Sequence, residues 1–333
     1  MERMLKMPKT HNNKKKKRFN LYNLAKDGKG VRKEDVIRDL NFINFFKLYA
    51  RRFSSIVAVN LFIIFGNFPI WFGLLGVSGN VGMESRLHTN VLYPLLRGVM
   101  SGGTTPVSAA LYGAIGQRQV HYVLNTAAYV LIGLSALTIF TYGIVNAATA
   151  YVLRNMVKCD PLFLPQDFFY AIRRNWKQAL PFGVIDVLLS ALLVYDIVFF
   201  YYNATSFLRS AMFFLAVALG IIYFVMRYYL YLMMVTFSLS IGKLLKNAFI
   251  FAMINFRRNL VGTIGIVAAV ALCFYLTYVF LPLGTVVLLF LLLGSCAFIA
   301  TYTAWPKIKS VMIDPYYRET ASADTGAVYA EQE

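Results

Sequence analysis

An apolar run without a single charged residue extends from Leu260 to Ala304 and constrains this chain more than any other feature. A helix crosses the hydrocarbon core of a bilayer in about 20 residues, so the run is long enough for two crossings. Near its middle, Leu281-Pro282-Leu283-Gly284 supplies turn-forming residues. The run therefore predicts a membrane hairpin with spans at Leu260–Phe280 and Leu283–Ala304.

The rest of the chain has the same character. Of its 333 residues, 59% are hydrophobic and only 14% are charged, and the charges are grouped in blocks between long apolar segments. This pattern predicts an all-α polytopic membrane helical bundle of about six transmembrane helices, carrying cytoplasmic amphipathic surface helices. The four further spans are expected at Ser54–Leu75, Val123–Ala147, Leu180–Tyr202 and Leu208–Val235.

The net charge of +18 would suit a nucleic-acid-binding protein. A soluble protein with so much apolar sequence would not stay in solution, however, so nucleic acid is not an expected partner. The expected partners are the lipid bilayer and its anionic head groups.

Lysine and arginine are concentrated in alternate connections: the N-terminal segment, the second and fourth loops and the tail. Basic loops stay on the cytoplasmic side, so both termini are predicted to be cytoplasmic in a multi-pass protein of the bacterial cell (plasma) membrane. The one long outer loop, 76–122, is then extracellular.

Three regions follow from this topology. Residues 1–33 are predicted to be a basic, disordered cytoplasmic N-terminus, which lacks the apolar core of a cleaved signal peptide. Residues 34–318 form the six-span membrane domain. Residues 319–333 are small, polar and acidic, and are predicted to be a disordered cytoplasmic tail.

Basic and aromatic residues occur together before the odd-numbered spans, at Glu34–Phe53, Asp167–Gln178 and Asn247–Arg258. Such segments are typical of interfacial helices. They are consistent with a weak threefold repeat, or with the general convergence of juxtamembrane helices on aromatic residues and arginine. The side chains expected to contact a partner or lipid are Phe168, Phe169, Arg173, Arg174, Trp176, Lys177, Arg257 and Arg258.

Asp186 and Arg227 lie inside apolar spans, where charged side chains are costly and are often functional. They fall at matching depth in consecutive antiparallel spans, which predicts a buried ion pair. Asn60, at similar depth in the first span, is expected to complete it by hydrogen bonding. The group either stabilises the bundle or handles a substrate or proton.

Asp196 lies nearer the outer half of the same span, with no basic residue at its depth in the neighbouring span. Its expected neighbours are Asn67, Tyr275 and Tyr278. It either serves a proton-coupled transporter or is a hydrogen-bonded structural residue. The tyrosines at the span end, Tyr228 to Tyr231, are expected to form an interfacial belt.

No pattern of catalytic or metal-ligating residues is present. The three histidines lack partners at helical spacing, the three cysteines lack ligand spacing, and the glycine-containing stretch Ser101–Pro106 lacks the lysine of a phosphate-binding loop. We therefore expect no enzyme activity, no cofactor and no metal.

Six stretches, in order, resemble the YesL-like (DUF624) family of bacterial integral membrane proteins. They are Asn60–Pro69, Asn146–Asn155, Leu164–Leu180, Ile185–Asn203, Phe280–Gly284 and Pro306–Tyr317. The resemblance covers most of the chain from Lys29 to Tyr317. This chain departs from short family members by a long insertion at Trp71–Thr141. Through the genes that neighbour family members, the resemblance implies a role linked to carbohydrate uptake.

Two functions are compatible with these features. The first is a non-enzymatic accessory or regulatory membrane protein linked to ABC-type carbohydrate uptake or its sensing, with a sugar ABC transporter or sensor kinase as partner. The alternative is a small-molecule or ion-coupled transporter that uses the intramembrane Asp and Arg residues. No span is broken by paired glycine or proline near its middle, which favours the first.

Overall fold

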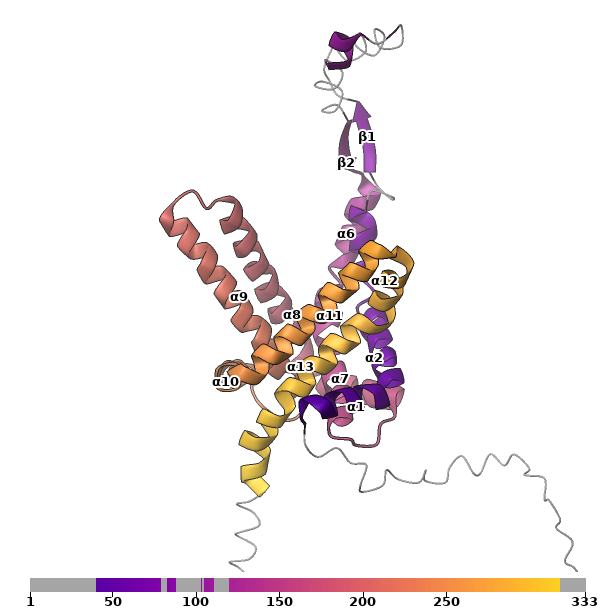
Figure 1. Cartoon of the computed structure of the whole chain (residues 1–333). Helices are drawn as coiled ribbons and strands as arrows, with labels where there is room; N and C mark the ends of the chain where they lie inside the picture. Colours follow the sequence, from indigo (N-terminus) through magenta and orange to yellow (C-terminus); the bar gives the residue numbers. More distant parts are fainter. Residues whose placement is uncertain (1–39, 79–82, 88–102, 104, 111–119, 318–333) are drawn as a thin grey trace, which may run out of the picture. The chain divides into compact units, whose positions relative to one another are not determined.

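The structure is a computed structural model that describes residues 40–78, 83–87, 103, 105–110 and 120–317 (Figure 1). The predicted N-terminal segment 1–33, the tail 319–333 and most of the long loop lie outside these residues. All described elements belong to one compact unit, Asp39–Glu333. Within the described residues, the chain is helical except for one two-stranded ribbon and the connecting turns.

Five helical stretches are long and apolar enough to cross a membrane: Thr126–Val157, Leu164–Tyr202, Phe207–Met234, Phe256–Val279 and Leu281–Tyr317. A sixth is counted if α1 (Phe42–Arg51) and α2 (Phe53–Gly66), which meet at 76°, form one bent span. Of the most apolar 18-residue stretch of α9 (Phe207–Met234), only 6% is buried within the protein. Apolar surface of this extent needs lipid around it, so the chain is a multi-pass membrane protein.

The predicted C-terminal hairpin is present. Its first helix is α11 (Phe256–Val279). The second begins as α12 (Leu281–Val287) and continues through η3 (Leu288–Leu292), α13 (Leu293–Ile308) and η4 (Lys309–Ile313). Phe280 alone separates α11 from α12, and Pro282 occupies the first turn of α12, where a missing N–H costs nothing.

The predicted first span, Ser54–Leu75, is two helices rather than one. α2 ends at Gly66 and α3 (Ile70–Val77) begins after Pro69, with tighter turn hydrogen bonds across Asn67 to Phe72. Proline lacks the N–H that would continue the α-helical bonding, so the break falls at this residue. The expectation that no span is broken by glycine and proline near its middle is therefore wrong for the first span, which breaks between Gly66 and Pro69. The second span likewise consists of α6 (Thr126–Ser135) and α7 (Thr138–Val157), and it extends beyond the predicted end.

The expectation of a separate surface helix at Asp167–Gln178 is wrong. This segment is the beginning of α8 (Leu164–Tyr202), a continuous helix that contains Pro181 without ending there. The basic segment and the predicted third span are therefore parts of one helix. Two of the predicted surface segments do form separate short helices before a span, namely α1 and α10 (Ile241–Ile254).

The long loop contains secondary structure that the sequence analysis did not predict. β1 (Met83–Leu87) pairs antiparallel with β2 (Val120–Leu124), with Met83 opposite Leu124 and Leu87 opposite Val120. The ribbon closes the loop close to the start of α6, as Figure 1 shows. β2 is rich in β-branched and aromatic residues, which favour strands, but so short a segment gives little periodicity to detect.

Helices α7 and α8 cross in close contact at Gly143 and Gly183. A Cβ atom on Gly143 would lie 2.1 Å from the carbonyl oxygen of Ala179 and 2.5 Å from Cα of Gly183. Only glycine allows two helix backbones to approach this closely, as in other membrane helix pairs. The crossing fixes the depth at which Tyr142 on α7 meets Asp186 on α8.

Candidate functional site

A cluster of polar side chains is enclosed between α7, α8 and α9, next to this crossing. It consists of Asp186, Arg227, Tyr142, Tyr223 and Tyr231, and is called the Asp186 cluster below. Asp186 is completely buried. Tyr223 donates its hydroxyl hydrogen to Oδ1 at 2.7 Å, and Tyr231 donates to Oδ2 at 2.6 Å. Both carboxylate oxygens therefore accept a short hydrogen bond from a tyrosine of α9.

Arg227 supplies the positive charge of the cluster, and the predicted ion pair is present. Its Nε lies 3.2 Å from Oδ1 of Asp186, without the alignment of a hydrogen bond. Its Nη2 donates to the hydroxyl oxygen of Tyr142, and the guanidinium lies 5.4 Å from the centre of the Tyr142 ring. A buried charge is tolerable only when it is paired and hydrogen-bonded, and the fully buried carboxylate of Asp186 meets both conditions.

Asn60 is not part of the cluster, so the prediction that it completes the ion pair is wrong. Its Nδ2 donates to the carbonyl oxygen of Leu289 at 2.6 Å, and its Oδ1 accepts from the backbone N–H of Gly294 at 2.7 Å. Asn60 therefore connects α2 to η3 and α13. The carbonyl of Leu289 lies within the π-helical turn η3 and the N–H of Gly294 lies just after it, where the regular helical bonding is interrupted.

Asp196 has a different environment. It is half-buried, and no hydrogen bond or ion pair joins it to any residue that the structure describes. Asn67, one of its expected neighbours, donates instead to the carbonyl oxygen of Ile63 within α2. The other two, Tyr275 and Tyr278, are exposed on α11. The four polar residues singled out in the sequence thus occupy three separate sites.

The basic and aromatic residues at the start of α8 divide into an inward and an outward face. Phe168 is buried and stacks on Phe62 of α2, with ring centres 4.7 Å apart. The outward face carries the remaining predicted contact residues, all exposed: Phe169, Arg173, Arg174, Trp176 and Lys177. This set is called the α8 basic face below.

Arg257 and Arg258, adjacent at the start of α11, also differ from each other. Arg257 is exposed. Arg258 is half-buried, and its Nη2 donates to the carbonyl oxygens of Leu40 at 2.9 Å and Tyr302 at 3.2 Å. Arg258 therefore holds the start of α1 against α11 and α13.

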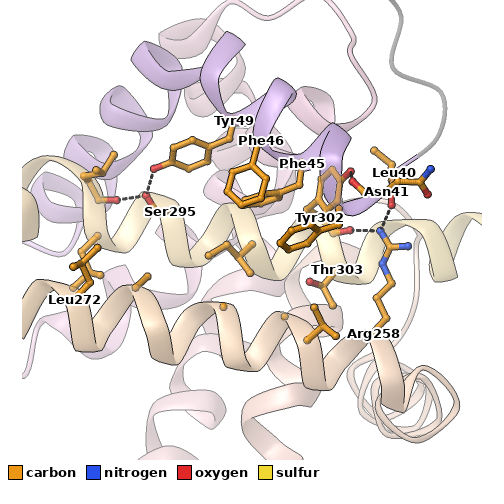
Figure 2. Close-up of a pocket in the computed structure, with 18 of the residues that line it drawn as sticks. Leu40, Asn41, Phe45, Phe46, Tyr49, Arg258, Leu272, Ser295, Tyr302 and Thr303 are labelled. Carbon is orange, nitrogen blue, oxygen red and sulfur yellow. Dashed lines mark hydrogen bonds between the residues drawn. The ribbon is translucent and has the colours of Figure 1, made fainter.

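Arg258 also lies at one end of an apolar cavity of about 780 Å³, which is shown in Figure 2 and called the α1–α11 groove below. Its walls come from α1, α11, α12, η3 and α13. Tyr302 donates to the carbonyl oxygen of Asn41 at 2.7 Å, and Tyr49 is hydrogen-bonded to Ser295 at 2.7 Å. These bonds fix α1 across α13, and the space between α1 and α11 remains open.

Sequence reasoning found the two charges of the Asp186 cluster but missed its tyrosines. Tyr228 and Tyr231 were expected in an interfacial belt, yet Tyr228, Tyr229 and Tyr231 are all buried. A signal was present, because Tyr223, Arg227 and Tyr231 follow one another at intervals of four residues and therefore share one face of a helix. The α1–α11 groove gave no comparable signal, since it is formed by elements far apart in the sequence.

Within the part of the chain that the structure describes, no group of three or more His, Cys, Asp or Glu side chains could hold a metal ion. Comparison with known proteins adds no relative: no family model, no curated protein and no solved structure matches the chain.

Proposed function

We propose that the protein is a non-enzymatic accessory or regulatory subunit of the bacterial plasma membrane, with both termini in the cytoplasm. It acts with an ABC-type carbohydrate uptake system or its sensor kinase. The link to carbohydrate uptake comes from the resemblance to the YesL-like family. The observation that carries the accessory role is the α8 basic face.

α8 is longer than a membrane crossing requires. Its 39 residues correspond to about 58 Å at about 1.5 Å per residue, whereas the hydrocarbon core is about 30 Å thick. Exposed charged residues are costly in the hydrocarbon, so the basic N-terminal turns are the part that extends beyond it. There, Phe169 and Trp176 are about half exposed beside Arg173, Arg174 and Lys177. Exposed aromatic and basic side chains in one patch are typical of protein contact surfaces.

The arrangement of the polar residues favours this role over transport. A transport path needs polar groups that a substrate or ion can reach. Asp186 is completely buried and both of its oxygens are occupied, while Asn60 and Asp196 lie at separate sites. The Asp186 cluster thus acts as an internal connection between α7, α8 and α9.

The test is co-purification of the full chain in mild detergent, with identification of bound proteins by mass spectrometry. The wild type is expected to retain a sugar ABC permease or a sensor kinase. A variant with Arg173, Arg174, Trp176 and Lys177 all replaced by alanine is expected to lose it. These side chains are exposed, so the replacement should leave the bundle folded.

The matched control replaces exposed residues at the opposite end of the α8–α9 hairpin, Tyr201, Tyr202 and Arg209, by alanine. This variant should retain the partner. Retention by the α8 variant, or absence of any sugar permease or sensor kinase from the wild-type sample, would contradict the proposal. Substrate-dependent proton flux into vesicles that contain only this protein would establish the transporter instead.

A further inference from the structure

The α1–α11 groove is open to the membrane. Its floor on α11 is formed by small residues, Gly262, Gly265 and Ala269. Several lining side chains are themselves largely exposed: Phe42 at 70%, Val261 at 58% and Leu272 at 58%. The groove therefore opens at the surface that α1 and α11 present to lipid, and it is not a closed internal void.

The two ends of the groove differ in charge, as Figure 2 shows: the guanidinium of Arg258 lies at one end, and the uncharged, hydrogen-bonded hydroxyls of Tyr49 and Ser295 lie at the other. Arg258, Asn41 and Tyr302 lie at one end, and Leu272 lies at the other. From Arg258 to Leu272, α11 rises about 21 Å at about 1.5 Å per residue. One leaflet of the hydrocarbon core is about 15 Å thick, half of about 30 Å. The groove thus has the length of one leaflet plus the adjoining head-group region.

The depth of the groove follows from the charge at its polar end. α11 is a candidate membrane span that begins at Phe256, and a guanidinium is costly within hydrocarbon. Arg258 therefore lies at the boundary between hydrocarbon and head groups, and Leu272 lies in the hydrocarbon. A molecule filling this space would be charged at one end and apolar along its length.

An apolar space of this size does not remain empty next to lipid. The hydroxyl groups of Tyr49, Ser295 and Tyr302 are hydrogen-bonded within the protein, so the groove offers water few free partners between its ends. An unfilled void also forfeits the dispersion contacts of the side chains around it. Acyl chains can enter from the surrounding leaflet. An acyl chain is surrounded by hydrocarbon both inside and outside the groove, so the hydrophobic effect does not favour either place. Packing in the groove and contacts of the head group therefore determine which lipid stays bound.

The charge of Arg258 selects the head group. Its Nη2 is engaged with the Leu40 and Tyr302 carbonyls, but no hydrogen bond from Nε or Nη1 to any described residue is found. Among the residues that the structure describes, no carboxylate lines the groove to neutralise the guanidinium. A phosphodiester anion is the head-group chemistry that a guanidinium with free N–H donors binds best.

We propose that the α1–α11 groove is a binding site for one anionic phospholipid of the surrounding leaflet, with an acyl chain lying along Gly265 and Ala269 and the phosphate at Arg258. The site is separate from the α8 basic face, and the proposal does not depend on the accessory role.

The first test fills the groove. The full chain is reconstituted in vesicles of equal parts phosphatidylcholine and phosphatidylglycerol, extracted in mild detergent, and analysed by native mass spectrometry for retained lipid. Ala269→Trp places an indole in the groove and should lower retained phosphatidylglycerol about tenfold. Ala268→Trp is the matched control, because Ala268 is the exposed neighbour that does not line the groove. It should retain lipid like the wild type.

The second test removes the charge. Arg258→Gln should lower the preference for phosphatidylglycerol over phosphatidylcholine about fivefold, the factor that corresponds to about 1 kcal/mol for one basic side chain near the membrane surface. Arg257→Gln, at an exposed position outside the groove, should leave the preference unchanged. If Arg258→Gln does not fold, the two tryptophan variants still decide the question.

Three results would overturn the proposal. One is equal retention of lipid by the Ala268→Trp and Ala269→Trp variants. Another is equal retention of phosphatidylcholine and phosphatidylglycerol by the wild type. The third is retention of a free fatty acid in place of a phospholipid.

Discussion

Asp186 and Asp196 are the same residue type on the same helix, about 15 Å apart along α8 at about 1.5 Å per residue. Asp186 is completely buried, with two tyrosine donors and a guanidinium around it. Asp196 is half-buried, without a hydrogen bond or ion pair to any described residue, and the neighbouring Tyr195 is 62% exposed. The difference arises from what packs against each half of α8.

At the level of Asp186, α8 contacts both α7 and α9. The Gly143–Gly183 crossing brings α7 close, and Phe182 packs edge-on against Tyr231 with ring centres 5.3 Å apart. Further along, many side chains of α8 and α9 are exposed, among them Leu192, Val194 and Phe214. An acidic residue within an apolar helix is thus enclosed only where a third helix covers the pair.

The largest expected effect is the loss of Asp186. Asp186→Ala should lower the free energy of unfolding by about 3–5 kcal/mol, because Arg227, only 28% exposed, loses its counter-charge and the Tyr223 and Tyr231 hydroxyls lose their acceptor. Asp196→Ala, the matched change on the same helix, should alter it by no more than about 0.5 kcal/mol. Unfolding in mixed micelles of mild and denaturing detergent measures both. An equal loss of unfolding free energy in the two variants would contradict the conclusion that only Asp186 is enclosed.

A smaller effect is expected from separating α7 and α8. Gly143→Ala places a methyl group against backbone atoms of α8, which cannot move aside as the tip of a side chain can, so stability should fall by about 1–3 kcal/mol. Gly133→Ala is the control, since a Cβ there meets nothing within 4 Å. Gly133→Ala should leave the free energy of unfolding unchanged or raise it by up to about 1 kcal/mol, because alanine has a higher helix propensity than glycine. A stable Gly143→Ala protein would show that the crossing does not determine the enclosure of Asp186.

The smallest effect concerns a single hydroxyl. Tyr231→Phe removes one donor to Asp186 and should lower the free energy of unfolding by about 0.6 kcal/mol and at most about 1.7 kcal/mol, the average and the maximum for side-chain hydrogen bonds between membrane helices. Tyr195→Phe, beside Asp196, should change nothing, because that hydroxyl is at an exposed position. The same unfolding measurement compares the two. If Tyr195→Phe lowered the free energy of unfolding more than Tyr231→Phe, the surroundings of Asp196 and not those of Asp186 would be the enclosed part of α8.

Long apolar segments were predictable because each carries its own signal in composition and length. The hairpin around Phe280 and the ion pair between Asp186 and Arg227 followed from uncharged runs and from matching depth in adjacent spans. The position of Asn60 was not predictable in this way. Depth along a span says nothing about which side of a helix faces which neighbour, and Asn60 faces η3 and α13.

Breaks and joins between helices were also poorly predicted. The basic segment at the start of α8 resembles a surface helix in composition, yet the helix continues through Pro181, although proline removes one backbone hydrogen bond there. At Pro69 the chain does break, and α3 follows. Whether a proline ends a helix depends on whether neighbouring helices hold both sides in line, which is a tertiary property.

The sequence alone determined that this chain is a helical membrane protein, because the free energy of transferring apolar residues into lipid depends on their type and number and not on their arrangement. Tertiary structure alone decided which intramembrane charge is enclosed, which arginine lies at the end of the α1–α11 groove, and that this groove exists. These depend on contacts between residues as distant in sequence as Leu40, Arg258 and Tyr302, and such contacts are set only when the helices pack.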